Sequence, residues 1–535
     1  MKKAIRVLSF TMTTLMVAAM AVGCKGSTGT KTTVATGGPK KYSQQVEIKI
    51  PVYDRGTQGA APVDNNYWTK YVQTNFGDKY NIKVTFVPIP RTSDIDKFNL
   101  LLASGTAPDV IFSYDYSTAM SFYNRGAYQT LNTSTIKTYA PDYYKRNSSV
   151  MKYGQVKNQQ IFLPATRPAT YNWVTLIRQD WLDKIGAKIP ANQDEYENVL
   201  KQFKAQQLGG NSTIPLTYSL SKAYYPAYGQ VGKTMSEKDI ALYSDTAVCA
   251  LSYSAVKAQL KFDNKLYNEG LISPEWSLDK DGKKAQADFT SGKAGVYGCY
   301  LTKDNPPIIQ TLLQNVPTAK VAILTNVQPA GNNPITRADN AFGMLSGINK
   351  KCAHPEAVMM YFNWLSQDKN LFTMQNGIEG KNYTLDSSGL PVAQNNTGDE
   401  KLNYNSNKDY WCLVTEGKDF GSDDKNLKVM ENTYAPTGYE YLIENAAKLT
   451  KSNEKYAIHD YLFNTAIASQ TKYAPTLLTK WQADQVKLVT AKESDFDTAY
   501  NAAVKDYLAS GYQEILDEKL KVYNSMTSSG SSSSK

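Results

Sequence analysis

The stretch SDIDKFNLLLASGTAPDVIFSYD, Ser93–Asp115, contains the helix and strand pattern that decides the fold. Ser93 is a typical helix N-cap residue, Gly105 is a typical helix stop, and the apolar run near the end predicts a strand. Upstream, VEIKIPVY (Val46–Tyr53) and IKVTFVPI (from Ile82) predict two more strands with a helix between them. This β-α-β-α-β order predicts an α/β fold with a parallel sheet covered by helices on both faces.

Polar and aromatic residues follow two of these predicted strands. Asp54 and Arg55 come directly after the first strand, and Tyr114, Asp115 and Tyr116 end the third. Ligands of such sheets collect at the carboxyl ends of the strands. We therefore expect these five side chains to face the same crevice.

The N-terminal segment predicts export. A basic start, Met1–Arg6, precedes an uncharged apolar run of 16 residues, Val7–Val22, which is shorter than the ~20 residues of a membrane-spanning helix. This pattern is typical of a secretory signal, here residues 1–23. The residues before Cys24 resemble a bacterial lipobox, although Ala21 stands where leucine is usual. The resemblance implies a lipid on Cys24, whereas an ordinary signal with a chance cysteine is the alternative.

Both ends of the mature chain are predicted to lie outside the fold. Residues 24–41 are rich in Gly, Ser, Thr and Lys, which suits a flexible tether, and residues 526–535 form a Ser-rich tail expected to be disordered. The roughly 500 residues between them are too many for one core and are expected to divide into domains.

Composition limits the classes of partner and chemistry. The net charge of +10 is spread along the chain without a long basic run, which argues against a nucleic-acid partner. The 38 tyrosines supply flat faces with polar tips that suit polar ligands. Cys249, Cys299, Cys352 and Cys412 lack C-x-x-C spacing. Sequence alone does not decide whether they form disulfides, and we favour buried free thiols.

Sequence motifs of known catalytic sites are not found. His354 and His459 do not stand in a zinc-binding spacing, and no G-x-S-x-G motif occurs. AYGQVGKT, Ala227–Thr234, imitates a phosphate-binding loop but has Ala227 in place of the first glycine. We therefore expect no metal, no cofactor and no catalytic residues, although carboxylate pairs leave a secreted glycan-active enzyme open.

Five stretches resemble, in order, elements of family 1 of the extracellular solute-binding proteins. Two carry the family's most recognisable elements: LLASGTAPDVIFSYD (Leu101–Asp115) and the segment Leu176–Lys204, which contains RQDWLDKIGAKIP. FTSGKAGVYG (Phe289–Gly298) and Ala338–Leu365 are similar to later elements. NGIEGKNYTLDSSG (Asn376–Gly389) resembles a block of the lipoprotein LplA-like subgroup.

The resemblance implies a two-lobe, type II periplasmic-binding-protein-like fold. Each lobe is expected to hold a mainly parallel sheet flanked by helices, and hinge strands are expected to join the lobes. The chain is expected to cross from one lobe to the other near Pro164–Asn172, near Tyr297–Leu301 and after Leu365. The expected segments are lobe 1 over 42–165 and 298–365, lobe 2 over 166–297, and mainly lobe 2 with C-terminal helices over 366–525.

Sugar recognition combines aromatic faces with hydrogen-bonding side chains. Besides the strand-end residues, the first crossing supplies Arg167, Asn172 and Trp173. Trp173 is either a platform for a sugar ring or core filler. Arg178, Asp180 and Trp181 are expected to stabilise the start of a helix rather than to contact the solute. Further candidate ligand-binding residues are Trp276, Tyr300, Asn340, Glu379 and Trp411.

The resemblance implies a binding function without catalysis. The chain is expected to be a monomeric solute-binding protein of an ABC importer, held on the extracellular face of the cell membrane by a lipid on Cys24. It is expected to capture a carbohydrate and to deliver it to membrane permease subunits. An oligosaccharide is the first candidate for this carbohydrate. A glycan-active enzyme, a surface sensor and a binding protein for a peptide or other non-sugar solute are the alternatives.

Overall fold

A computed structural model describes residues 39–57, 59–167, 173–220, 235–244, 248–300, 305–324, 327–333 and 336–530. The side chains of residues 173, 300, 305–307, 336, 337, 529 and 530 are not part of this description. The predicted signal, Cys24 and residues 531–535 of the predicted tail lie outside the described residues. Residues 526–530, expected from the sequence to be disordered, instead form the end of the helix Gln513–Gly530. Among the described helices, none is long and apolar enough to cross a membrane.

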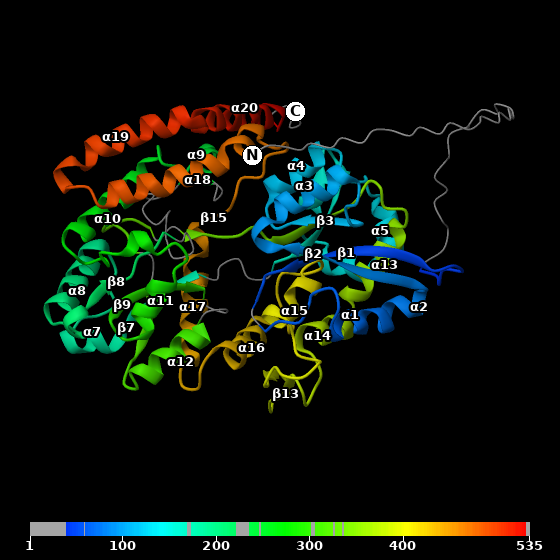
Figure 1. Ribbon diagram of the computed structural model, residues 1–535, viewed down its shortest axis with the longest axis horizontal. Coiled ribbons are helices and arrows are strands. Elements are labelled where there is room, and N and C mark those ends of the chain that lie inside the picture. Colours follow the sequence, from blue (N-terminus) through cyan, green and yellow to red (C-terminus); the bar gives the residue numbers. More distant parts are fainter. Residues whose placement is uncertain are drawn as a thin grey trace, which may run out of the picture. The chain divides into compact units, whose positions relative to one another are not determined.

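The first predicted strands and helices are confirmed (Figure 1). Strands β1 (Val46–Asp54) and β2 (Ile82–Pro90) pair in parallel over their whole length. Between them run α1 (Tyr67–Val72), a π-helical segment and α2 (Asp78–Tyr80). Helix α3 (Asp94–Ser104) ends at Gly105, whose φ of 74° is left-handed, a conformation that glycine adopts without steric cost.

A second sheet of the same part of the chain is antiparallel. It has the order β3 (Val110–Ser113), β12 (Phe342–Ile348) and β6 (Phe162–Thr166), with β12 antiparallel to both neighbours. The prediction of a mainly parallel sheet is therefore correct for β1 and β2 but wrong for β12. The physical reason is that β12 is reached through a long excursion of the chain, so no helical crossover dictates its direction.

The next sheet of the chain contains four strands in the order β10 (Val321–Leu324), β7 (Trp173–Arg178), β9 (Ala294–Tyr300) and β8 (Ile214–Leu216). Only β8 and β9 are parallel, and the other two pairs are antiparallel. This sheet is mixed, again in contrast to the expected mainly parallel arrangement.

The sheets locate the crossings of the chain. The first falls between β6 and β7, as predicted. Because β10 pairs with β7, the chain stays with the four-stranded sheet until Leu324, and the predicted crossing at residues 297–301 is too early. Buried residues from Leu371 to Val414 belong to the core around β1 and β12, so the last crossing also comes later than Leu365. Local patterns identify a strand but not the sheet that it joins.

The remaining elements surround these sheets. The helices of the first half are α4 (Tyr116–Asn124), α5 (Thr133–Tyr139), α6 (Pro141–Asn147), α7 (Gln179–Ile185), α8 (Gln193–Ala205), α9 (Glu237–Tyr243) and α10 (Ser254–Asn268). Those of the second half are α11 (Lys283–Thr290), α12 (Asn305–Asn315), α13 (Pro355–Ser366), α14 (Asp368–Asn376), α15 (Tyr404–Trp411), α16 (Asp423–Tyr434), α17 (Glu440–Asn453), α18 (Ala468–Val489), α19 (Phe496–Tyr507) and α20 (Gln513–Gly530). Short strands are β4 (Gln155–Val156), β5 (Gln159–Gln160), β11 (Thr336–Arg337), β13 (Tyr383–Leu385), β14 (Pro391–Ala393) and β15 (Ala457–Ile458).

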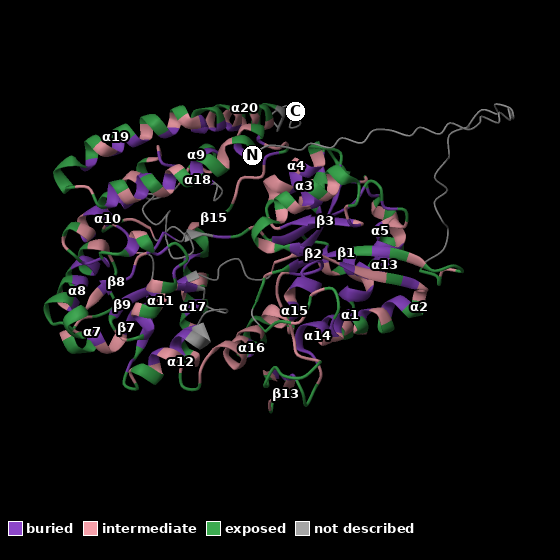
Figure 2. Ribbon diagram, viewed as in Figure 1, coloured by how far each residue is buried: buried purple, intermediate pink, exposed green. Residues whose placement is uncertain are grey.

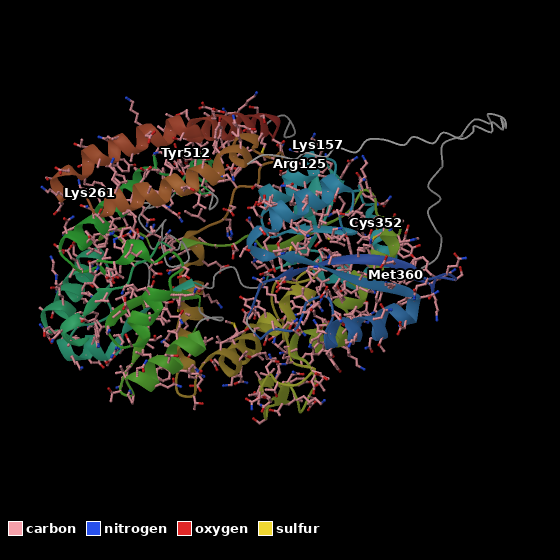
Figure 3. All side chains as sticks on the ribbon, in the orientation of Figure 1. Arg125, Lys157, Lys261, Cys352, Met360 and Tyr512 are labelled. Atoms are coloured by element: carbon pink, nitrogen blue, oxygen red, sulfur yellow. The ribbon has the colours of Figure 1, made fainter. Side chains whose placement is uncertain are left out.

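Two main groups of buried side chains form the cores (Figure 2). The first surrounds β1, β3 and β12 and includes Cys352 and Met360, both labelled in Figure 3. The second includes Trp181 and, from the C-terminal helices, Tyr512 (Figure 3). Cys299, Cys352 and Cys412 are buried free thiols, whereas Cys249 is a half-buried free thiol, so the favoured buried thiols are found for three of the four cysteines.

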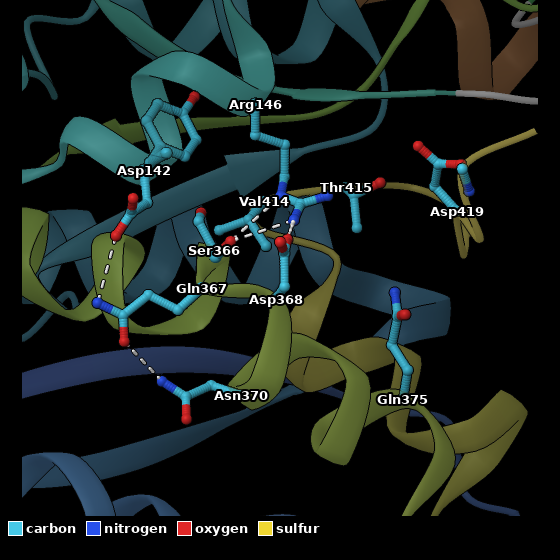
Figure 4. Close-up of polar contacts among 12 residues, drawn as sticks. Asp142, Arg146, Ser366, Gln367, Asp368, Asn370, Gln375, Val414, Thr415 and Asp419 are labelled. Atoms are coloured by element: carbon cyan, nitrogen blue, oxygen red, sulfur yellow. Dashed lines mark hydrogen bonds and ion pairs between the residues drawn. The ribbon is translucent and has the colours of Figure 1, made fainter.

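Arg146 joins two helices of the first core (Figure 4). Its Nε and Nη2 donate to the Ser366 carbonyl at 3.3 and 3.2 Å, and Nη2 pairs with Asp368 at 2.6 Å. Nearby, Gln367 donates to Asp142 at 3.2 Å. The cluster holds α6 against the junction of α13 and α14, where the last carbonyls of α13 lack helical partners.

The close packing of β12 gives a testable prediction. A Cβ on Gly347 would lie 2.2 Å from a ring carbon of the buried Tyr128, so Gly347→Ala must displace the ring and should lower the free energy of unfolding by at least about 1–3 kcal/mol. Urea unfolding measures this change.

The neighbouring Ser346 supplies the control. Its side chain is fully buried and its hydroxyl has no hydrogen-bond partner among the described residues. Ser346→Ala therefore removes none of the described bonds and should change stability by less than about 1 kcal/mol. Equal stabilities of the two variants would contradict the close contact between Gly347 and Tyr128.

Candidate ligand-binding site

The end of β1 presents a charged turn. The exposed Asp54 accepts a hydrogen bond from the backbone N–H of Gly56 at 2.9 Å, which closes the turn after the strand. Arg55 Nε and Nη2 each donate to one carboxylate oxygen of Asp409 at 2.8 Å. Burial lowers the pKa of Arg55, but the bonds and charge of Asp409 outweigh it, and the pKa is raised overall.

Tyrosine rings connect the ends of β1 and β3. The rings of Tyr53 and Tyr114 stack with centroids 6.1 Å apart. The Tyr53 hydroxyl donates to Asp94 Oδ2 at 2.8 Å, and Arg91 pairs with the same oxygen at 3.3 Å. The Arg91 guanidinium lies 4.8 Å from the Tyr53 ring centroid, a distance at which a cation attracts an aromatic face. This contact brings the ends of β1 and β3 together, but it does not place all five expected side chains in one crevice, because Tyr114, Asp115 and Tyr116 do not line the cavity beside Asp54 and Arg55.

A second ion pair lies beside Tyr114. Lys408 donates to Glu416 Oε1 at 2.5 Å, and its ammonium is 6.0 Å from the Tyr114 ring centroid. Burial is the largest cause that raises the pKa of Tyr114 well above its usual value, and the nearby carboxylates of Glu416 and Asp409 add to it. Tyr114 therefore stays a neutral phenol with one flat face on Tyr53.

The start of α15 is strained. Asn405, Ser406 and Asn407 have φ values of 45°, 54° and 62°, and each left-handed non-glycine residue costs roughly 1–3 kcal/mol. Trp411 Nε1 donates to the Ser406 carbonyl at 2.7 Å, and Asn407 Oδ1 accepts from the Asn403 N–H at 2.7 Å. These bonds hold a turn that places both Tyr404 and Asp409 near Arg55.

These residues enclose a cavity of about 210 Å³. Arg55 crosses it, with its guanidinium 4.5 Å from the ring centroid of Tyr404. One wall comes from the segment after β1 and the other from α15 and the residue before it. The lining residues are Tyr53, Asp54, Arg55, Gly56, Thr57, Ala60, Ala61, Pro62, Val63, Asn403, Tyr404, Asn407, Asp409 and Tyr410.

The strand-end candidates divide between different roles. Asp54 and Arg55 line the cavity, and Tyr114 lies behind it through its contact with Tyr53. Asp115 instead caps α4, because its carboxylate accepts from the Thr118 N–H at 2.7 Å. Tyr116 is half-buried against Phe342 with ring centroids 6.3 Å apart.

The crossing candidates lie elsewhere. Arg167 pairs with Asp339 at 3.2 Å, and its N–H donates to the Ala341 carbonyl. Asn340, between these two partners, is half-buried. Asn172 lies outside the described residues. Trp173 and Tyr300 face each other as backbone partners of β7 and β9, and their side chains are outside the description.

Three candidates are placed away from the cavity. Trp276 is 1% exposed and packs edge-on against Tyr218 in the second core. Trp411 is 3% exposed and belongs to the first core. Glu379 is exposed beside the β13–β14 hairpin. The two tryptophan faces are covered by protein in this structure, so we do not propose them as sugar platforms.

Sequence reasoning missed the second wall of the cavity. Tyr404, Asp409 and Tyr410 fall in the region for which no resemblance was found. The signal that could have located it is the Asn-rich run NYNSN, Asn403–Asn407, because asparagine tolerates left-handed turns.

Metal ligands do not gather in the part of the chain that the structure describes, where no group of three or more His, Cys, Asp and Glu side chains could hold an ion. His459 Nδ1 lies 2.9 Å from the Asp339 carbonyl, and the His354 ring lies 5.9 Å from Tyr42. Both histidines therefore have local protein contacts.

Lys418 gives a pH-dependent prediction. Its ammonium donates to Asn376 Oδ1 at 2.8 Å, and burial lowers its pKa to about 8. An unfolded lysine stays protonated up to a pH of about 10.4. Between these values the unfolded chain binds more protons, so stability rises with pH.

The comparison of wild type with Lys418→Met tests this assignment. The burial cost of the charge is present below pH 8 and disappears above pH 10, and each pKa unit corresponds to about 1.4 kcal/mol. Wild type should therefore gain stability relative to the variant from pH 7 to pH 10 in chemical unfolding. Lys369→Met, at an exposed lysine of α14, is the control, and a constant difference for Lys418→Met would refute the lowered pKa.

The chain is similar to two proteins of Bacillus subtilis. The chain is 25% identical to lipoprotein LipO of Bacillus subtilis over 399 residues, which cover 69% of this chain and 72% of LipO. It is 21% identical to the polygalacturonan/rhamnogalacturonan-binding protein YtcQ of the same organism over 401 residues, 71% of this chain and 75% of YtcQ.

Solved structures show the same fold. The alginate-binding protein AlgQ2, in a crystal structure without calcium, superposes with a TM-score of 0.64 at 17% identity and covers 91% of this chain and 100% of its own. A solute-binding protein of Bifidobacterium longum infantis, described as HMO-binding and ABC-transporter-associated, has a TM-score of 0.62 at 18% identity, with 90% and 99% covered. These likenesses confirm the predicted two-lobe α/β fold.

The match to a protein-family model confirms the family that the five sequence motifs predicted. The model of the bacterial extracellular solute-binding proteins matches residues 60–371, more than half of the chain. This range includes all the strands of the three-stranded and four-stranded sheets, β3, β6, β7, β8, β9, β10 and β12. The chain therefore belongs to the family of bacterial extracellular solute-binding proteins.

Proposed function

We propose that this chain is the lipid-anchored solute-binding component of an ABC importer and that its solute is an oligosaccharide. The observation that carries the proposal is the cavity at the end of β1, which combines the Tyr404 ring with the polar groups of Arg55, Asp409 and Asn403. Flat rings pack on the apolar face of a pyranose, while polar groups bond its hydroxyls.

The relatives support a carbohydrate. YtcQ is named for binding two pectic polymers, and the similar structures include proteins described as alginate-binding and HMO-binding. Membership of the solute-binding family supports capture without catalysis. In the cavity itself, both oxygens of Asp409 are already bonded to Arg55, an arrangement that suits positioning of a ligand.

The proposed mechanism is a population shift. A solute that contacts both lobes binds the closed form more tightly than the open form and so increases the closed population. The closed protein then docks on membrane permease subunits, which carry the ATP-driven transport. The protein works as a monomer at the extracellular face of the membrane. Other proposed contacts are Arg167, Asn172 and Trp173 from the first crossing and Tyr300, the strand partner of Trp173.

Ligand binding is tested by thermal unfolding of the purified chain against a panel of oligosaccharides. A bound sugar stabilises the native state and should raise Tm with concentration. Tyr404→Ala should weaken the affinity roughly tenfold, about 1.4 kcal/mol, because a ring face is lost.

Tyr144→Ala is the matched control for Tyr404→Ala. Tyr144 is also half-buried and carries a cation, Lys137, 4.7 Å from its ring centroid, but it lies on α6 and does not line the cavity. Its replacement should leave the affinity unchanged. If both variants bind like wild type, the cavity is not the sugar site, and if no sugar raises Tm, the carbohydrate proposal fails.

The lipid anchor is tested separately. Mass spectrometry of protein from the membrane fraction should find a lipid-modified Cys24 as the first residue. The variant Cys24→Ala should lack the lipid and leave the membrane fraction. An unmodified N-terminus at another residue would remove the anchor from the proposal without affecting sugar binding.

A further inference from the structure

The cavity at the end of β1 is not cationic, although the whole chain carries a formal charge of +10. Its described lining contains one arginine, Arg55, and two aspartates, Asp54 and Asp409. The formal charge of this lining is therefore negative.

Arg55 is already neutralised. Its Nε and Nη2 occupy both oxygens of Asp409 at 2.8 Å, and the Asp409 side chain is only 8% exposed. A planar guanidinium bound in this bidentate way has used its Nε–Nη2 edge, and its charge is matched by that of Asp409, so another carboxylate could reach only the Nη1–Nη2 edge. An incoming acidic group would have to compete for Arg55 with the buried carboxylate of Asp409, which belongs to the same chain.

The neighbouring cations are also paired. Arg91 pairs with Asp94 at 3.3 Å, and Lys408 pairs with Glu416 at 2.5 Å. Lys401 reaches the rim, where its ammonium donates to the Gly59 carbonyl at 2.6 Å, but it is not part of the lining. The cationic groups around the cavity therefore already have protein acceptors.

Asp54 adds a repulsive element. Its exposed carboxylate lines the cavity, and its described contact is the Gly56 N–H. A ligand carboxylate placed beside it would meet a like charge, which disfavours the ionised form of either group. Repulsion of this kind discriminates against a ligand as effectively as attraction selects one.

We infer that, within the proposed carbohydrate function, this cavity takes an uncharged sugar residue and discriminates against uronic acids. The inference rests on the proposed function and narrows it. The reason is that the cavity offers the Tyr404 ring while its arginine is matched by the carboxylate of Asp409. Arg55 and Asp409 are the residues that set the specificity, through the charge that they cancel.

The experiment is isothermal calorimetry of the full mature chain with neutral gluco-, galacto-, manno-, xylo- and fructo-oligosaccharides and with oligogalacturonides and alginate fragments. Methyl-esterified oligogalacturonides are included, because they keep the linkage and ring of the acid without its charge. The inference expects binding of a neutral sugar at least about tenfold tighter than that of any acid. It also expects an affinity that changes little between low and high salt.

The outcomes distinguish failure of the inferred charge discrimination from failure of the proposed carbohydrate function. An acidic oligosaccharide that binds as tightly as any neutral one overturns the inference and leaves the carbohydrate proposal intact. Binding of an amino-sugar oligomer in preference to all neutral sugars also overturns it, in the opposite direction. Binding of no sugar at all refutes the proposed function and the inference with it.

Asp409→Asn tests the cause of the discrimination. The substitution keeps the shape of the side chain and frees the charge of Arg55, so it should raise the affinity for oligogalacturonides relative to neutral sugars by about tenfold. Glu444→Gln changes the net charge equally at an exposed pair with Lys448 on α17 and should leave the ratio unchanged. Circular dichroism and Tm establish that both variants fold. A folded Asp409→Asn protein with the wild-type ratio contradicts the proposed role of the pair.

Discussion

The ion pair between Arg55 and Asp409 joins residues that are 354 positions apart in the chain. It fixes the turn after β1 to the middle of α15 and so creates the two walls of the cavity. Removing either partner would leave a largely buried charge without compensation, which costs roughly 3 kcal/mol or more. The position of Tyr404, whose ring lies under the Arg55 guanidinium, depends on the same contact.

Two other features support this pair. The stack of Tyr53 on Tyr114 holds the ends of β1 and β3 together, and the strained turn at Asn405–Asn407 brings Asp409 to Arg55. Strain of this kind persists only where surrounding bonds determine the conformation, and here Trp411 supplies such a bond to Ser406. The covered position of Trp411, which sequence alone suggested as a ligand contact, is explained by this supporting role.

Local signals in the sequence were sufficient for much of the secondary structure. The alternation in Val46–Tyr53 and the glycine at 105 predicted a strand and a helix end, and the structure contains both of them. These features depend on interactions within a few residues. Asp115 shows the limit of the same reasoning, because a carboxylate after a strand can cap the next helix as well as face a ligand.

The sequence by itself determined the family and the individual strands and helices, because motif order and apolar periodicity are carried by neighbouring residues. It also identified Asp54 and Arg55, since they directly follow a strand. Only the tertiary structure decided which sheet each strand joins, which tryptophans are covered, and that Asp409 neutralises Arg55. These properties depend on contacts between residues hundreds of positions apart, and the physical reason is that burial and charge compensation exist only once distant segments have packed together.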